Sequence, residues 1–213
     1  MIVYLNILFE LICFLLALIT LTKAGKKWLM FIPYLFIVLG IELWGMYAYA
    51  QKINSNVVYN FYVLLNFVFI QFVLHKICTI TTNRDRTNVL FLFIFTLFFV
   101  SEVYYFGYKN FAVKSIIFSY FLISVQCLYY FYTLLKQDSF VNLPQHAPFW
   151  LAAGILFHAI GSTVSYLFYD YLVTIYLELG IPVRQIIFVF LNFILYGSWS
   201  YAFICKYRQR ISS

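Results

Sequence analysis

Long apolar stretches alternate with short polar breaks along the whole chain. Seven such stretches cover residues 2–22, 28–50, 57–80, 89–107, 112–136, 148–169 and 184–205. A helix needs roughly 20 apolar residues to cross the hydrocarbon core of a bilayer, and each stretch is about that long. The pattern therefore predicts an all-α integral membrane protein, a bundle of seven transmembrane helices that forms one domain over residues 1–213.

Two of the polar breaks decide how many spans there are. The fourth break is marked only by Gly107, Lys109 and Asn110, but joining its flanks would give a span of nearly 50 residues, far too long for one crossing. The last break, YDYLVTIYLELGIP, is still rather apolar. We expect its YLVTIYLEL segment to form a short amphipathic helix at the membrane interface.

The composition agrees with a chain that is solvated by lipid. Hydrophobic residues make up 65% of the 213 residues, aromatic residues 23% and charged residues only 10%. A soluble domain carries about 25% charged residues, so the composition excludes a soluble globular protein and a disordered chain. It also excludes a nucleic-acid-binding domain, and the net charge of +7 is better explained by membrane orientation.

The 14 basic residues test the number of spans, because lysine and arginine gather in cytoplasmic loops. With seven spans and the N-terminus outside, one side receives ten of them: Lys23, Lys26, Lys27, Lys76, Arg84, Arg86, Lys136, Lys206, Arg208 and Arg210. The other side receives four: Lys52, Lys109, Lys114 and Arg184. We therefore expect an external N-terminus and a cytoplasmic C-terminus, in the cytoplasmic (inner) membrane.

The chain lacks the motifs of several known membrane chemistries. The four cysteines form no CxxC pair, and the three histidines form no HExxH motif, so we expect no metal site and no disulfide. There is no GxSxG nucleophile and no GxxxxGK[ST] loop. The seventh stretch has no lysine between Arg184 and Lys206, which excludes a retinal Schiff base there. We expect no cofactor.

Polar side chains inside the apolar stretches are the candidate site residues, because an ionisable group in the membrane is costly and often functional. Our candidates for ligand binding, all expected in the outer half or middle of the membrane, are Glu10, Glu42, Asn60, Asn66, His158 and Asn192. The alternative for each asparagine is a simple hydrogen bond between helices, worth about 0.6 kcal/mol. Glu102 lies within two turns of a helix end, where its side chain can reach outward instead.

Helical spacing places some of these residues on shared faces. Gly154, His158, Gly161 and Ser165 fall on one stripe of the sixth stretch. One interpretation is a tight helix–helix contact with a hydrogen-bonded histidine; the other is a histidine that faces Glu10 or Glu42 and acts as a sensor or relay. In the seventh stretch, Gln185, Asn192, Tyr196 and Trp199 share a face that should point inward.

A weak internal echo relates the two halves of the chain. Trp28, Gly40 and Leu65-Asn66-Phe67 recur as Trp150, Gly161 and Leu191-Asn192-Phe193. This spacing would pair the first three helices with the last three and leave the fourth as a linker, as in transporters built from parallel repeats. Three matched positions in an aromatic-rich chain can also arise by chance.

Three segments together carry a family resemblance. They are GIELWGMYAYAQKINSNVVYNFYVLLNFVFI, PFWLAAGILFHAIGSTVSYLF and FLNFILYGSWS. They resemble a group of small, largely uncharacterised seven-helix membrane proteins of Bacteroidota, whose motifs map onto Glu42, Asn60 with Tyr62, Phe149-Trp150 with Gly154 and Gly161, and Asn192. Where the group often has a glutamate, this chain has Asn66. Because genes of the group often neighbour two-component sensor genes, the resemblance implies an association with signalling.

Three functional hypotheses follow. The first is a non-enzymatic sensory module that perceives a small molecule, lipid or ion in an outward-facing polar chamber and acts through a separate sensor kinase or regulator. The second is a small-solute transporter with a three-plus-one-plus-three arrangement of helices. The third is a membrane enzyme acting on lipid, with Glu42 and His158 as acid and base, which requires the two side chains to be within hydrogen-bonding reach.

Overall fold

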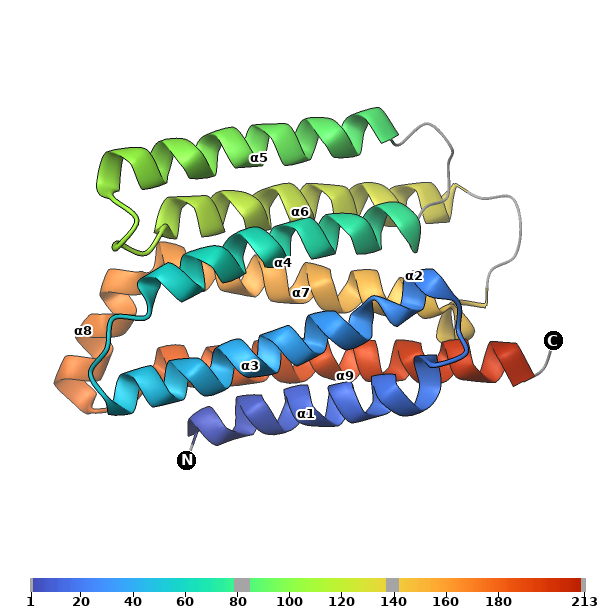
Figure 1. The fold of residues 1–213 in the computed structure, drawn as a ribbon, viewed down its shortest axis with the longest axis horizontal. Coiled ribbons are helices and arrows are strands. Elements are labelled where there is room, and N and C mark those ends of the chain that lie inside the picture. Colours follow the sequence, from blue (N-terminus) through green and yellow to red (C-terminus); the bar gives the residue numbers. More distant parts are fainter. Residues whose placement is uncertain (1, 79–84, 137–141, 212–213) are drawn as a thin grey trace.

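The fold is a bundle of long helices that run side by side (Figure 1). A computed structural model describes residues 2–78, 85–136 and 142–211. The helices are α1 (Ile2–Leu21), α2 (Lys26–Leu29), α3 (Phe31–Ala50), α4 (Asn56–Lys76), α5 (Asp85–Phe106), α6 (Val113–Leu135), α7 (Ala147–Leu167), α8 (Tyr169–Leu179) and α9 (Val183–Ile211), with a 3-10 turn η2 at Leu143–Gln145. Seven spans in the described residues are long and apolar enough to cross a membrane. The prediction of an all-α, seven-helix, multi-pass membrane protein is confirmed.

Most helix boundaries lie within a few residues of the predicted ones, and two differ for clear reasons. The second span begins as the short helix α2 and is interrupted at Met30, because Pro33 has no N–H to continue the helical ladder back to Leu29. The last helix does not end near residue 205 but continues to Ile211. Arg84, the side chain of Arg86 and the expected end of the third span at residues 79–80 lie outside the described residues.

The length of α9 sets it apart from the other spans. Its 29 residues correspond to about 44 Å of helix, whereas the hydrocarbon core is about 30 Å thick. Arg208 and Arg210 stand in its last turn, where positive charge is favourable against the helix dipole. The end of α9 therefore extends beyond the apolar region.

The short helix expected in the last polar break is also confirmed. It is α8, an 11-residue helix that connects α7 to α9 and lies across one end of the bundle (Figure 1). Gly180 ends it with a φ of 68°, a left-handed conformation that glycine adopts without a steric penalty. The two chain termini lie at opposite ends of the bundle, as an odd number of crossings requires (Figure 1). Which end faces the cytoplasm stays a prediction.

Six helices form a closed ring, and α5 stands outside it. The ring follows chain order: α1 packs on α3, α3 on α4, α4 on α6, α6 on α7, α7 on α9, and α9 back on α1. The outer helix α5 packs against α4 and α6 and is the least buried of the seven spans. A space inside the ring is thus surrounded by helices from both halves of the chain.

The contact between α7 and α9 is the most extensive in the bundle, and it depends on two glycines. A Cβ atom at Gly154 would lie 2.8 Å from Cβ of Ser198, and one at Gly161 would overlap a methyl group of Leu191. Small residues allow two helix backbones to approach closely. The stripe seen in the sequence therefore does form a tight helix–helix contact, as the first interpretation proposed.

Aromatic side chains fill the part of the ring that lies away from α8. The ring of Phe31 packs edge-on against Phe69, Trp199 and Phe203, with ring centres 5.0–5.2 Å apart. Tyr34 stacks on Phe69 with ring centres 3.6 Å apart. This cluster fills the interior of the ring on that side.

Candidate functional site

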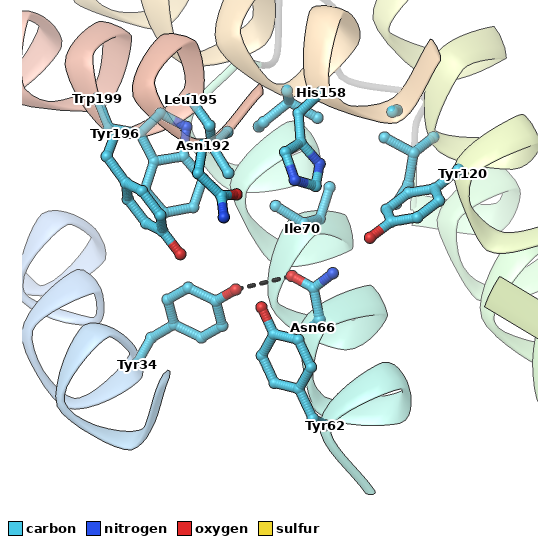
Figure 2. A pocket seen from close by; sticks show the side chains of 13 residues that line it. Tyr34, Tyr62, Asn66, Ile70, Tyr120, His158, Asn192, Leu195, Tyr196 and Trp199 are labelled. Atoms are coloured by element: carbon cyan, nitrogen blue, oxygen red, sulfur yellow. Dashed lines mark hydrogen bonds between the residues drawn. The ribbon is translucent and has the colours of Figure 1, made fainter. Parts of the chain in front are cut away.

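A small polar cavity lies in the middle of the ring. Its volume is about 30 Å³, and side chains from α3, α4, α6, α7 and α9 surround it (Figure 2). The lining residues are Tyr34, Tyr62, Asn66, Ile70, Tyr120, Ile123, Ile155, His158, Ala159, Asn192, Leu195, Tyr196 and Trp199. A cavity of this size has room for about two water molecules or one very small solute.

The polar groups of the cavity come from opposite sides and point toward a common centre (Figure 2). The hydroxyl of Tyr34 donates a hydrogen bond of 2.7 Å to Oδ1 of Asn66. Across the cavity, His158 lies within hydrogen-bonding reach of Asn192 and meets the ring of Tyr120 edge-on at 5.7 Å. The cavity thus offers hydroxyl, amide and imidazole groups, and none of the described residues that line it is an acid, a lysine or an arginine.

The indole of Trp199, which lines the cavity, carries a hydrogen-bond donor that is unpaired in the described part of the chain. Its side chain is 0% exposed, and its Nε1–H finds no hydrogen-bond acceptor among the described residues. In a membrane interior an unsatisfied donor costs several kcal/mol, because no bulk water can take the acceptor's place. An acceptor placed at Nε1 would satisfy this donor.

The structure brings three of the six candidate residues together. Asn66, His158 and Asn192 line the cavity from α4, α7 and α9. His158 faces Asn192, whereas the sensor or relay interpretation had placed it against a glutamate. Of the inward face expected in the last span, Asn192, Tyr196 and Trp199 line the cavity, whereas Gln185 is exposed.

Sequence reasoning did not find Tyr34 and Tyr120, and it reached Tyr62 only as part of the family resemblance. Each contributes a ring and a hydroxyl to the cavity wall. The chain contains 20 tyrosines, and most positions where they occur are equally compatible with lipid-facing or interfacial rings. Their place in the cavity wall distinguishes these three from the others, and Tyr34 and Tyr120 also contact Asn66 and His158 respectively.

Neither of the two candidate glutamates is among the described residues that line the cavity. Glu10 of α1 is 2% exposed and stands next to the hydroxyl of Tyr196, which does line the cavity. Glu42 of α3 is half-buried and close enough to Glu10 to repel it. Their role in ligand binding stays a prediction.

Asn60 lies apart from the cavity and binds the turn between α5 and α6. Its Nδ2 donates to the carbonyl oxygens of Tyr108 and Asn110 at 3.3 and 2.8 Å, and its Oδ1 accepts from the backbone N–H of Ala112 at 2.9 Å. The amide is thus engaged with backbone groups on both of its polar atoms, which explains its burial without a ligand.

We predict that Asn60→Ala destabilises the protein by about 2–3 kcal/mol, because three hydrogen bonds between its buried side chain and the turn would be lost. The midpoint of thermal unfolding in detergent measures the effect. Asn54→Ala is the matched control, since exposed Asn54 gives the same turn only one bond of 3.4 Å, to the carbonyl oxygen of Lys109. Equal midpoints for the two variants would contradict a structural role for Asn60.

Glu102, expected to reach outward, instead turns toward the start of α6. Its carboxylate accepts the backbone N–H groups of Lys114 and Ser115 at 3.0 and 2.6 Å and also the hydroxyl of Ser115. The residue before the helix, Ala112, has no polar side chain to cap it. A carboxylate from α5 therefore serves as the cap of α6.

At the opposite end of the bundle, the extended α9 contacts the segment that leads into α7. Nε2 of Gln209 donates to the carbonyl oxygen of Gln145 at 2.8 Å. The thiol of Cys205 donates to the carbonyl oxygen of Pro144 at 3.6 Å. Partial burial lowers the pKa of His146, which precedes α7, so its imidazole is neutral at neutral pH. A shift of α9 would therefore act directly on this segment through these contacts.

Comparison with known proteins adds no further assignment. No family model matches the chain, and no curated protein or solved structure is significantly similar to it. Among the described residues, no group of three His, Cys, Asp or Glu side chains could hold a metal ion. The cavity is the feature on which a functional hypothesis can be built.

Proposed function

We propose that this protein is a non-enzymatic sensory module of the cytoplasmic membrane that recognises a small, uncharged polar solute in the central cavity. The observation that carries the proposal is the convergence of Asn66, His158, Asn192 and Trp199 on one cavity from three helices. Polar groups are rare in apolar spans, and their meeting at one place favours ligand recognition over isolated links between helices.

The chemistry of the lining favours an uncharged solute that both accepts and donates hydrogen bonds. Trp199 needs an acceptor, while the tyrosine hydroxyls and the two amides can take either role. The volume of about 30 Å³ restricts the occupant to a few non-hydrogen atoms unless the helices move apart. Binding of a larger solute would therefore change the helix packing, which is what a sensor requires.

A change in the cavity has a direct route to the other end of the bundle. Asn192, Tyr196 and Trp199 belong to α9, the helix that continues about 14 Å beyond the length of a typical span. We infer that α9 transmits a shift to a separate kinase or regulator. The basic residues Lys206, Arg208 and Arg210 would bind an acidic surface of that partner. The partner remains part of the proposal.

The solute-binding step can be tested on the purified protein in nanodiscs. We expect at least one of formamide, acetamide, urea and glycerol to raise the unfolding midpoint with saturation, because a ligand of the native state stabilises it. Asn192→Leu should weaken the apparent affinity about tenfold or more, the cost of one buried hydrogen bond. Ala159→Val, which narrows the cavity without removing a polar group, should weaken it as well.

Asn54→Ala, far from the cavity in an exposed loop, is the control and should bind like the wild type. Two results would contradict solute binding in this cavity. One is a saturable rise of the unfolding midpoint that is unchanged in Asn192→Leu and Ala159→Val. The other is no saturable rise with any of the four solutes. The signalling step is tested separately by affinity purification of the intact protein from native membranes. Recovery of a sensor kinase or response regulator is the expected result.

A solute transporter is the second candidate, and one observation favours it. The ring contains three helices from each half, with α5 outside it, and the third helix of each half contributes an asparagine to the cavity, Asn66 and Asn192. This is the arrangement expected of a three-plus-one-plus-three transporter. Uptake of one of the four solutes into liposomes, abolished by Asn66→Leu and by Asn192→Leu, would favour transport over sensing.

The third hypothesis, a lipid enzyme, receives no support from the site. It needs Glu42 and His158 as an acid–base pair, but His158 faces Asn192, and Glu42 does not line the cavity. We therefore do not propose an enzymatic function.

A further inference from the structure

A second feature of the ring interior is a buried carboxylate without a counter-charge. Glu10 stands near the middle of α1, about 12 Å along the helix from its first residue. Its side chain is 2% exposed, and its Oε2 has no hydrogen-bond partner among the described residues. A carboxylate in this position is costly unless something compensates its charge.

The groups around Glu10 do not supply that compensation. Those that act on it electrostatically are Glu42 and Tyr34 from α3, Tyr59 and Tyr62 from α4, Tyr196 from α9 and Cys13 from α1 itself. None of them is basic, and Glu42 adds a second negative charge. Arg184 is engaged elsewhere, against the rings of Tyr166, Tyr169 and Phe188 at 5.1–5.4 Å.

A second polar atom on the same helix needs the same kind of partner. Oδ1 of Asn6, one turn before Glu10, is buried and also has no hydrogen-bond partner among the described residues. Both partnerless atoms on α1 are acceptors, whereas the partnerless atom in the cavity, Nε1 of Trp199, is a donor. The missing partner on α1 is therefore electropositive and differs from the solute expected in the cavity.

We propose that Glu10 and Glu42 together hold one monovalent cation, a proton or an alkali-metal ion, between α1 and α3. One positive charge relieves the repulsion between two carboxylates in a low-dielectric interior and gives Oε2 of Glu10 the electropositive partner that it lacks among the described residues. The oxygen atoms of Asn6, Tyr59 and Tyr196 are the further groups available to an alkali-metal ion.

The cation site and the cavity share one side chain. Tyr196 has its hydroxyl beside Glu10 and also lines the cavity, so an occupied cation site sets the orientation of a group that the solute meets. Only this coupling rests on the proposed function. The cation site itself stands on the burial of Glu10 and on its neighbours.

Carbodiimide labelling tests the site, because dicyclohexylcarbodiimide reacts with a protonated carboxyl group in an apolar setting. The full-length protein in nanodiscs is treated at neutral pH in sodium, potassium or choline chloride, and the adduct is located by mass spectrometry. Labelling of Glu10 or Glu42 in all three salts identifies the cation as a proton. An alkali-metal ion is identified if labelling occurs in choline chloride but is suppressed in sodium or potassium chloride, and if the suppressing salt also raises the unfolding midpoint.

Variants separate the site from other carboxyl groups. Glu10→Gln should abolish labelling at residue 10 and any salt effect, and Glu42→Gln should weaken both, since one carboxylate alone holds a cation less well. Glu178→Gln, on the exposed part of α8, should change neither. Absence of labelling in every salt together with no salt effect on the midpoint, or a salt effect that persists in Glu10→Gln, would overturn the proposal.

The same measurements distinguish this proposal from the solute-binding one. Asn192→Leu removes a cavity group that is not beside Glu10, so it should leave the labelling intact. Intact labelling with no solute binding refutes only the proposed function. Solute binding without labelling or a salt effect refutes only the cation site.

Discussion

Gly154→Leu should lower the stability of the protein by about 3 kcal/mol and reduce the yield of monodisperse protein in detergent. Even a Cβ atom at Gly154 would lie 2.8 Å from Cβ of Ser198 and 3.4 Å from the carbonyl oxygen of Leu195, so α7 and α9 would have to separate. Overpacking a close contact of this kind typically costs about 1–3 kcal/mol, and the obstacle here, Cβ of Ser198, cannot turn away because it is bonded directly to the backbone of α9. The midpoint of thermal unfolding and the size-exclusion profile measure the effect.

Gly197→Leu provides the matched control. Gly197 belongs to α9 as well, but it is exposed and a Cβ atom there would meet nothing within 4 Å. The same substitution should therefore leave the midpoint unchanged or slightly raised, since leucine favours a helix more than glycine does. If both leucine variants unfold at the same temperature, the close approach of α7 and α9 at Gly154 is refuted.

The second large effect is expected at Glu102, where replacement by alanine should cost about 3 kcal/mol. The substitution removes the acceptor for three donors at the start of α6, two backbone N–H groups and the hydroxyl of Ser115. Unpaired donors near the membrane edge and the lost charge at a helix N-terminus both contribute. Thermal unfolding gives the total loss, and hydrogen exchange of residues 113–117 shows whether the first turn of α6 opens.

Glu102→Gln distinguishes the contribution of the capping hydrogen bonds from that of the negative charge. The amide keeps one acceptor oxygen, so we expect a loss of stability between those of the wild type and Glu102→Ala. Glu178→Ala, on exposed α8, should have no measurable effect and controls for removal of an acidic residue. Wild-type exchange rates at the start of α6 in Glu102→Ala would show that the carboxylate is not the cap.

The sequence predicted the helices well because each long apolar stretch forms a helix independently of the others. A helix satisfies its backbone internally, and in lipid this requirement holds for every span whatever its neighbours are. The two deviations also have local causes, the missing N–H of Pro33 and the basic residues after 205 that favour continued helix. Both causes lie in the sequence itself, in residues next to the limits that hydropathy sets.

The candidate site was predicted in part. Asn66, His158 and Asn192 were found because polar groups in apolar spans are rare, and the three do share the cavity. Asn60 belonged to the same class by composition, yet its amide holds the turn between α5 and α6. Nothing in residue type or depth distinguishes an asparagine that faces a cavity from one that binds backbone.

By itself, the sequence determined that this is a multi-pass membrane protein with seven apolar helices, and it identified a short list of costly polar side chains. Both follow from local properties, the length of apolar runs and the price of polarity in hydrocarbon. Only the tertiary structure decided that six helices close a ring, that Tyr34 meets Asn66, and that His158 faces Asn192. These contacts join residues far apart in the chain, and they depend on how each helix is rotated about its axis, which helix–helix packing sets and hydropathy does not.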